Sequence, residues 1–335
     1  MAETLTLPGF VNAHSHTFQR GLRGSQEGHD FWGWRDAMLA FAETQTPANV
    51  RDTYARTYRE MRSAGYTAVG EFHYLGLEEA RAAAAAAAEV GMKLVVLLSA
   101  YGRGGLPRFR QESVADYLRQ VEELRADGIA TGLAPHSVRA CPRPWLEEIS
   151  QYGRENDLVL HVHADEQPHE IDECLAEHGL RPIELLADTG CLGPDTTIVH
   201  ATHANDPELD LLAQAGSRIC VCPTTEANLG DGYVPVARIR ERGIPLCIGS
   251  DCNARIDALE ELRELEGIAR RESGRRNVIE PSTLLSIGSG EGAASLGLDE
   301  WDPITIDLAH PTLSDVAAGG LQGALVMSCS AEVVR

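Results

Sequence analysis

The chain has 335 residues, of which 43% are hydrophobic and 5% aromatic, and its formal net charge is −21. This acidic balance argues against a nucleic-acid partner, because phosphate binding needs a basic surface. No apolar stretch approaches the roughly 18 residues of a membrane span. The N-terminus, MAETLTLPGF, lacks the basic start and long apolar core of a secretion signal. We therefore expect a cytoplasmic protein without a membrane partner.

Eight short apolar runs alternate with helix-like stretches along the chain. The runs cover residues 5–16, 66–74, 93–101, 129–139, 158–166, 196–203, 217–228 and 244–251. The helices expected between and after them cover residues 47–63, 77–90, 114–126, 144–156, 182–188, 207–215, 235–242 and 257–271. This alternation implies a parallel sheet. Eight repeats, without a Gly-rich dinucleotide loop after the first run, favour an α/β fold of the (β/α)8 TIM-barrel type over an open doubly wound sheet.

Two segments interrupt or follow this alternation. Residues 20–46 are too long for a simple strand–helix connection, and we expect them to form a substrate-binding loop at the barrel mouth. Residues 281–298 predict an additional, glycine-interrupted helix, and residues 301–335 contain short β-prone pieces. We therefore predict a barrel over residues 5–298 and a remnant C-terminal β segment over residues 299–335.

Side chains that bind metals or transfer protons lie at the ends of five runs. His14 and His16 close the first run, His136 the fourth, His163 with Glu166 the fifth, His200 the sixth and Asp251 the eighth. The C-terminal strand ends of a (β/α)8 barrel meet at one mouth, so these residues should converge. Zinc accepts histidine and carboxylate ligands, and a catalytic site leaves one position open for water. The pattern predicts a metal-dependent hydrolase, whereas ordinary core histidines explain the whole set poorly.

Two runs carry a second histidine. His161 and His163 are two residues apart on one strand and so face the same side. We assign His163 to the metal and His161 to a structural role in the barrel interior. His203 is a competitor for the role of His200, which we prefer because it ends the apolar run directly.

The single lysine, Lys93, bears on the number of metal ions. Binuclear barrels of this kind bridge their ions with a carboxylated lysine near a strand end, but Lys93 begins its run. We therefore expect one divalent ion, preferably Zn²⁺, although Fe²⁺ or Mn²⁺ accepts similar ligands.

The eight cysteines form no CxxC pairs, which indicates reduced thiols. Cys220 and Cys222 are expected to be small buried side chains rather than a zinc-thiolate site.

Eight segments together carry a family resemblance: PGFVNAHSHTFQRGLRG, FWGWRDAM, EFHYLG, APHSVRA, HVHADEQ, IVHATH, CPTTEANLGDG and IGSD. From about residue 7 to residue 272, the chain resembles the mononuclear deaminase branch of the amidohydrolase superfamily. Within that branch it resembles the N-formimino-L-glutamate deiminases of histidine breakdown. HSH and SD occur across the superfamily, whereas HSHTFQR, HSVRA and CPTTEANLGDG in this order are much more specific. The resemblance implies hydrolysis of N-formimino-L-glutamate to N-formyl-L-glutamate and ammonia.

The resemblance also implies roles for individual residues. The implied metal ligands are His14, His16, His163 and Asp251. Glu166 would shuttle protons, His200 would polarise the attacking water and Asp251 would accept its proton. The implied substrate-binding residues are Gln19, Arg35, Tyr74, His136 and Arg139. Arginine suits a substrate with two carboxylates because its guanidinium can grip a carboxylate through two parallel hydrogen bonds. Surface ion pairs are the competing interpretation of Arg35 and Arg139.

The resemblance has limits at the chain ends. In the family, residues before the first strand usually join the C-terminal tail in a small β-sandwich. Here HSH begins at residue 14 and the tail after Trp301 is short, so we expect a reduced or incomplete sandwich. The sequence after Asp251 also lacks the histidine expected there. These departures concern the sandwich, the oligomer interface and fine substrate choice, and a homodimer is kept open.

Two further functions stay open. A purine or pyrimidine deaminase of the same superfamily would share the reaction but would need a flat apolar slot. The low aromatic share and the arginine pair Arg35 and Arg139 argue against it. A non-catalytic barrel scaffold would have no physical need for the metal ligands or for Glu166.

Overall fold

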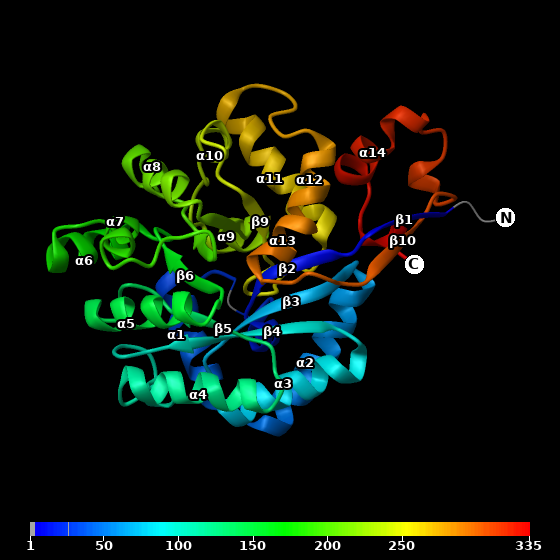
Figure 1. The fold of residues 1–335 in the computed structure, drawn as a ribbon. Helices are drawn as coiled ribbons and strands as arrows, with labels where there is room; N and C mark the ends of the chain where they lie inside the picture. The colour runs from blue at the N-terminus through cyan, green and yellow to red at the C-terminus, as the bar shows by residue number, and fades with distance from the viewer. Residues whose placement is uncertain (1–3, 26) are drawn as a thin grey trace.

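The computed structural model describes residues 4–25 and 27–335. Its centre is an eight-stranded parallel sheet whose strands follow one another in sequence order (Figure 1). The strands are β2 (Phe10–Ser15), β3 (Tyr66–His73), β4 (Lys93–Ala100), β5 (Thr131–Pro135), β6 (Leu160–Ala164), β7 (Thr196–His200), β8 (Arg218–Val221) and β9 (Leu246–Ile248). Each strand lies inside one of the eight predicted apolar runs.

The first and last strands of this sheet meet just beyond their regular ladders. Ser15 and Asp251 form an isolated parallel bridge. The backbone N–H of His16 donates to Asp251 O at 2.8 Å, and Asp251 N–H donates to His14 O at 3.0 Å. Asn253 Nδ2 also donates to Ser15 Oγ at 3.0 Å, across 238 residues of sequence. These contacts bring β2 beside β9, so the sheet is a nearly closed barrel and the TIM-barrel prediction is confirmed.

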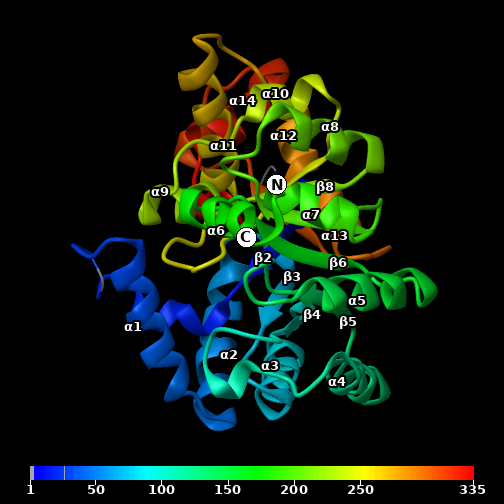
Figure 2. The ribbon, with the colours of Figure 1, turned by 90° about the vertical axis from the view of Figure 1, so that its left-hand side faces the viewer.

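Helices surround the strands, as the view in Figure 2 shows for α1, α4 and α8. The α-helices are α1 (Phe31–Glu43), α2 (Pro47–Ser63), α3 (Leu77–Val90), α4 (Val114–Ala126), α5 (Arg143–Glu155), α6 (Pro168–His178), α7 (Pro182–Asp188), α8 (Asp206–Ala215), α9 (Pro223–Leu229), α10 (Val236–Glu241), α11 (Ala258–Ser273), α12 (Pro281–Ile287), α13 (Gly290–Ser295) and α14 (Leu321–Ser328). Short 3-10 helices cover Thr17–Leu22, Pro107–Phe109, Pro311–Leu313, Ala318–Gly320 and Ala331–Val333. None of the described helices is both long enough and apolar enough to span a membrane.

The predicted helix bounds hold where the sequence contains explicit start and stop residues. Helices α2, α3, α4 and α7 have the predicted bounds. At the start of α2 the Thr46 side chain accepts from the Asn49 N–H, and α3 ends at Gly91, whose φ of 67° suits glycine. The predicted helix over residues 281–298 is divided into α12 and α13.

Four of the described α-helices were not predicted: α1, α6, α9 and α14, the last within the tail that was predicted as a β segment. The expected mouth loop over residues 20–46 is therefore largely helical. Asp30 begins α1 by accepting a hydrogen bond from Gly33 N–H at 2.9 Å. Because aspartate is a common N-cap residue, Asp30 could have predicted the start of α1. Helix α6 follows β6 directly, and α9 follows β8 at Pro223. Both short helices therefore lie at the C-terminal side of a strand, where a barrel places its functional side chains.

The chain ends form a separate small sheet. Strand β1 (Thr4–Pro8) pairs antiparallel with β10 (Pro303–Asp307). The first predicted run is thus divided at Gly9, where an added Cβ would lie 2.1 Å from Thr67 Oγ1 and 2.4 Å from Asp302 O. Figure 1 shows β1, β10, α14 and the C-terminus on the side of the molecule opposite α6 and α7. The domain boundary at residues 298 and 299 stays a prediction.

Candidate metal centre and active-site cavity

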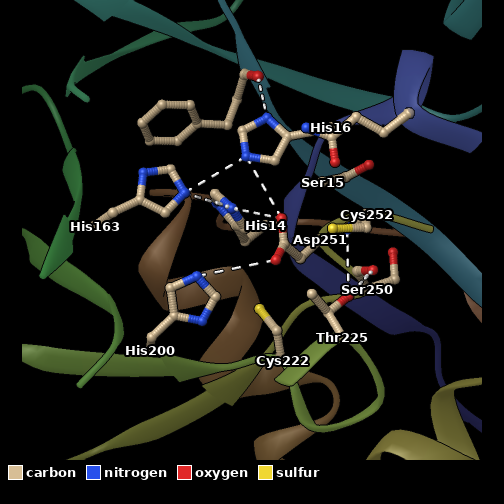
Figure 3. Close-up of polar contacts among 12 residues, drawn as sticks. His14, Ser15, His16, His163, His200, Cys222, Thr225, Ser250, Asp251 and Cys252 are labelled. Atoms are coloured by element: carbon tan, nitrogen blue, oxygen red, sulfur yellow. Dashed lines mark hydrogen bonds and ion pairs between the residues drawn. The ribbon is translucent and has the colours of Figure 1, made fainter. Parts of the chain in front are cut away.

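Four predicted metal ligands, His14, His16, His163 and Asp251, come together at the barrel mouth (Figure 3). His163 Nε2 lies 3.1 Å from His14 Nε2 and 3.4 Å from His16 Nε2. Asp251 Oδ1 lies 3.5 Å from Nε2 of both His14 and His16. All four residues are buried. Three strands, β2, β6 and the end of β9, therefore supply one compact group of nitrogen and oxygen donors.

The hydrogen bonds behind the histidines show why this group suits a cation. His16 Nδ1 lies 3.0 Å from Phe72 O, and His163 Nδ1 lies 2.9 Å from His136 O. A carbonyl oxygen only accepts, so each Nδ1 carries the proton and the neutral ring presents a lone pair at Nε2. Lone pairs that face one another at this distance repel unless a cation lies between them. The donor set therefore fits a divalent metal ion, and the backbone carbonyls fix the rings as outer-shell partners do in metal sites.

Burial also keeps the three histidines in the form that binds metals. It lowers the pKa of His14 to about 3 and the pKa of His163 well below its ordinary value, and it lowers the pKa of His16 as well. Burial alone would raise the pKa of Asp251, but its hydrogen bond with His14 and the nearby histidine charges hold that pKa below the usual range. Neutral imidazoles and an ionised carboxylate are the required ligand states.

Beside the donor group, His200 lies between two carboxylates that the sequence assigned to proton transfer. His200 Nε2 is 3.8 Å from Glu166 Oε1 and 3.9 Å from Asp251 Oδ2. Burial opposes a charge on His200, yet Glu166, Glu226 and Asp251 together raise its pKa to about 10. Burial likewise raises the pKa of Glu166. Side chains whose pKa values are shifted in this way are suited to hold and transfer protons.

A cavity of about 380 Å³ opens beside the donor group of His14, His16, His163 and Asp251. It is lined by all five predicted substrate-binding residues: Gln19, Arg35, Tyr74, His136 and Arg139. His16, His163, Glu166, His200 and Asp251 also reach its wall, whereas His14 does not. The structure therefore brings the predicted substrate residues and the predicted proton-transfer residues to one cavity, while their roles stay predictions.

The two arginines of the cavity differ in their partners. Arg139 Nε lies 3.8 Å from Oε1 of Glu170, whose side chain is 0% exposed. Within residues 4–25 and 27–335, Arg35 forms no ion pair, and its guanidinium lies 5.9 Å from the centre of the Trp32 ring. Neither arginine therefore forms the surface ion pair that was the competing interpretation. Arg35 thus has no carboxylate partner among the described residues, whereas Arg139 has Glu170.

His161 and His203, the second histidines of their runs, each lie beside a backbone carbonyl. His161 Nε2 lies 2.8 Å from Ser295 O in the barrel interior, and His203 Nε2 lies 2.8 Å from Asp231 O. Cys220 packs with Ala13, Val199 and Cys247 in a small apolar cluster. Cys222 belongs to the same cluster, but its sulfur also lies within 4.8 Å of donor atoms of His200 and Asp251.

Sequence reasoning missed two buried glutamates and three aromatic residues of this region. Glu226 Oε1 lies 3.2 Å from His200 Nδ1, and Glu170 Oε2 accepts from the Glu166 backbone N–H at 3.2 Å. The cavity wall also contains Phe31, Trp32 and Trp34 of the unpredicted helix α1. Glu226 lies within the segment CPTTEANLGDG, so the motif was visible although the contact was not.

Comparison with known proteins agrees with this architecture. The family model that matches is the amidohydrolase family, over residues 5–301. Formimidoylglutamate deiminase of Pseudomonas aeruginosa is 37% identical over 302 residues, which cover 81% of this chain and 66% of that protein. The chain thus spans slightly less than two thirds of that relative. A 5-methylthioadenosine/S-adenosylhomocysteine deaminase of Haloarcula marismortui is 29% identical over 329 residues, which cover 93% of this chain and 75% of that protein.

The fold itself is shared with solved structures. An adenosine deaminase from Xanthomonas campestris with bound zinc superimposes with a TM-score of 0.91 at 22% identity, covering 99% of this chain and 78% of that one. At this identity the likeness concerns the fold alone. The family match over residues 5–301, more than half of the chain, shows that the chain belongs to the amidohydrolase family.

Proposed function

We propose that this amidohydrolase is a metal-dependent deiminase that converts N-formimino-L-glutamate and water to N-formyl-L-glutamate and ammonia. The observation that carries the proposal is the pair of arginines in the wall of the same cavity as Glu166 and His200. Burial raises the pKa of Tyr101 and lowers the pKa of His136, and both arginine charges act to lower these two values; Tyr101 and His136 line the same cavity. A substrate with two carboxylates and one hydrolysable amidine matches two cations beside a hydrolytic group.

We further propose that the donor group binds one divalent ion through His14, His16, His163 and Asp251, with zinc as the preferred metal. When bound, such an ion lowers the pKa of water toward about 7 and thereby makes hydroxide available at neutral pH. The residues fit this ion because His16 and His163 each present an Nε2 lone pair beside His14 and Asp251.

The protein groups then divide the proton transfers. Asp251 accepts a proton from the attacking water, and His200 directs the nucleophile and stabilises the developing negative charge. Attack on the formimino carbon gives a tetrahedral intermediate. Asp251 passes the water proton to the departing nitrogen and Glu166 delivers a second one, so the carbon–nitrogen bond breaks and ammonia leaves. The carbonyl of the formyl group forms as the hydroxyl proton returns to Glu166. A positioned acid or base of this kind typically contributes about 10²–10⁴-fold to the rate.

A second candidate is a deaminase of adenosine-type substrates. Phe31, Trp32, Trp34, Tyr74 and Tyr101 line the cavity, so its wall is richer in aromatic residues than the 5% aromatic share of the chain suggested. Aromatic rings stack on flat bases. The relative from Haloarcula marismortui carries the name of such a deaminase. Arg35, which has no carboxylate partner among the described residues, and the higher identity to formimidoylglutamate deiminase favour the first candidate.

An ammonia-release assay tests the proposal. Purified zinc-loaded enzyme is offered N-formimino-L-glutamate, 5-methylthioadenosine, adenosine, guanine and cytosine at equal concentrations, and kcat/KM is measured for each. We expect the highest value for N-formimino-L-glutamate. Robust turnover of a nucleoside or base with none of N-formimino-L-glutamate would establish the second candidate. Protein that binds no metal and gains no activity with added Zn²⁺ would favour the non-catalytic scaffold.

Cytoplasmic location and homodimer assembly stay predictions. Cell fractionation tests the first. Light scattering of the purified protein tests the second, because a mass twice that of the chain is expected for a homodimer.

A further inference from the structure

His200 leaves strand β7 in an unusual backbone conformation. Its φ is 76°, and the next residue, Ala201, has a φ of 53°. The left-handed region is unfavourable for residues with a Cβ, so it is retained only where the surroundings fix it. Ala201 N–H donates to Ala164 O at 3.1 Å, which holds this turn against the end of β6. The turn directs the His200 ring into the group at the barrel mouth.

Glu226 holds the other side of that ring. Its Oε1 lies 3.2 Å from His200 Nδ1, and both side chains are 1% exposed. The same Oε1 accepts the Cys222 backbone N–H at 2.9 Å, and Glu226 N–H donates to Cys222 O at 2.9 Å. The carboxylate is therefore anchored at the start of α9 before it contacts the histidine.

This contact fixes both the tautomer and the direction of His200. An ionised carboxylate only accepts hydrogen bonds, so His200 Nδ1 must carry a proton. Nε2 then faces Glu166 and Asp251, at 3.8 and 3.9 Å. Within residues 4–25 and 27–335, Glu226 Oε2 has no hydrogen-bond partner and His200 is the one basic side chain in an ion pair with Glu226. Glu226 therefore holds the Nδ1 side of the ring, and Glu166 and Asp251 lie on the Nε2 side.

We infer that Glu226 is a positioning residue for hydrolysis: its buried carboxylate accepts from His200 Nδ1, directs Nε2 toward the attacking water, and balances positive charge that develops on the ring during the reaction. The inference rests on the role of His200 in the proposed function. In the described part of the chain, Glu226 does not line the cavity, and its side-chain ion pair is with His200. The alternative is a purely structural role, in which Glu226 serves only as an acceptor for the Cys222 N–H at the start of α9.

The variant Glu226→Gln separates these roles. Its amide oxygen can still accept from Cys222 N–H and from His200 Nδ1–H, but the negative charge is lost. A structural acceptor would tolerate this change, whereas a carboxylate that stabilises a charged histidine would not. Carboxylates that orient a catalytic histidine contribute up to about 10⁴-fold to turnover. Because the hydrogen bond survives, we expect a smaller loss, of about 10- to 100-fold in kcat, with KM unchanged within about 2-fold.

Glu261→Gln is the matched control. Glu261 is also fully buried, and it also accepts from the first turn of α9, through Thr224 N–H at 3.0 Å and the Thr224 hydroxyl. It makes no contact with His200. Because burial raises the pKa of Glu261 to about 8, kcat of both variants is measured above this pH, where Glu261→Gln removes a charge as well. This change at a contact of the same helix should leave kcat unchanged. Metal content is measured for both variants and should equal that of the unmodified enzyme.

A spectroscopic measurement gives a result that does not depend on turnover. In zinc-loaded enzyme labelled with ¹⁵N-histidine, the His200 Nδ1 proton is assigned as the signal missing from His200→Asn. We expect this proton at low field because it is shared with a carboxylate, shifted upfield in Glu226→Gln and unmoved in Glu261→Gln. If N-formimino-L-glutamate is not turned over, the proposed function fails, but this signal still decides the role of Glu226.

Two results would overturn the inference. One is a Glu226→Gln enzyme with unchanged kcat on whichever substrate releases ammonia, together with an unshifted Nδ1 proton. The other is an equal loss of kcat in Glu226→Gln and Glu261→Gln, because a general weakening of α9 would then explain both.

Discussion

At the barrel mouth, His14 and His163 face each other at 3.1 Å with almost no exposure to solvent. On the outer helix α4, Arg119 forms ion pairs with Asp116 and Glu123 while its side chain is 59% exposed. The outer pairs compensate their charges locally and are screened by water, so each contributes little to stability. The barrel mouth instead buries His14, His16 and His163 with their ring nitrogens facing one another at 3.1 and 3.4 Å. Such an arrangement costs stability by itself and is explained by what it binds and catalyses.

The largest expected effect in this comparison concerns two histidines of β6. His163→Ala removes one of the converging lone pairs, so we expect the bound metal to be lost. His161→Ala should keep the metal and lower the free energy of unfolding by about 1–3 kcal/mol, because Ser295 O loses its buried partner. Elemental analysis of the purified variants measures metal per chain. Full metal occupancy in His163→Ala would contradict the assigned ligand set.

The second effect concerns proton transfer at the mouth. Glu166→Gln preserves size and removes the titrating group, so kcat should fall by about 10² or more while the metal is retained. Steady-state kinetics on metal-loaded protein measures this loss. Unchanged turnover in the metal-replete variant would reject Glu166 as the proton shuttle.

The third effect tests the two arginines of the cavity. Arg139→Met and Arg35→Met each remove a charge-assisted contact worth about 1.5–3 kcal/mol, so kcat/KM for N-formimino-L-glutamate should fall at least about 10-fold. An analogue that lacks one carboxylate should lose less. Arg139→Met should also lower the melting temperature more than Arg35→Met, because only Arg139 is paired with buried Glu170. Equal kinetic losses on both substrates would indicate a structural role.

The fourth effect concerns stability and pH. Burial raises the pKa of Glu261 to about 8 from an ordinary value of 4.5. Between these values the folded protein holds a proton that the unfolded chain has lost, so stability falls as pH rises. The contribution of one such group is at most about 1.4 kcal/mol per pH unit. Urea unfolding from pH 5 to pH 8 should show a shallower decline for Glu261→Gln. An equally steep decline would show that Glu261 does not titrate in this window.

The smallest effect is expected on the outer helices. Arg119→Ala breaks exposed ion pairs on α4, so the free energy of unfolding should change by less than about 1 kcal/mol. Activity should not change. A loss of turnover in this variant would show that ion pairs on the outer helices affect catalysis at the barrel mouth.

The sequence allowed prediction of features with local signals. Pro47 and Gly91 mark the bounds of α2 and α3, and each barrel strand is an apolar run. The predicted ligands could be identified because a barrel brings strand ends together whatever their separation in sequence. The contact of Glu226 with His200 could not be predicted, because it depends on α9 turning back toward β7. That Arg35 lies over the Trp32 ring and forms no ion pair with any described residue likewise depends on how α1 lies over the cavity.

The bridge between Ser15 and Asp251 has a consequence for biosynthesis. The two sides of this seam are among the first and the last parts of the barrel to be made, and Ser15 and Asn253 are separated by 238 residues. At a translation rate of about 5–20 residues per second, His14 and His16 wait roughly 10 to 50 s before Asp251 is synthesised. During that interval a nascent chain can offer a metal ion only part of its ligands, so complete capture of the ion has to follow the arrival of the last barrel strand.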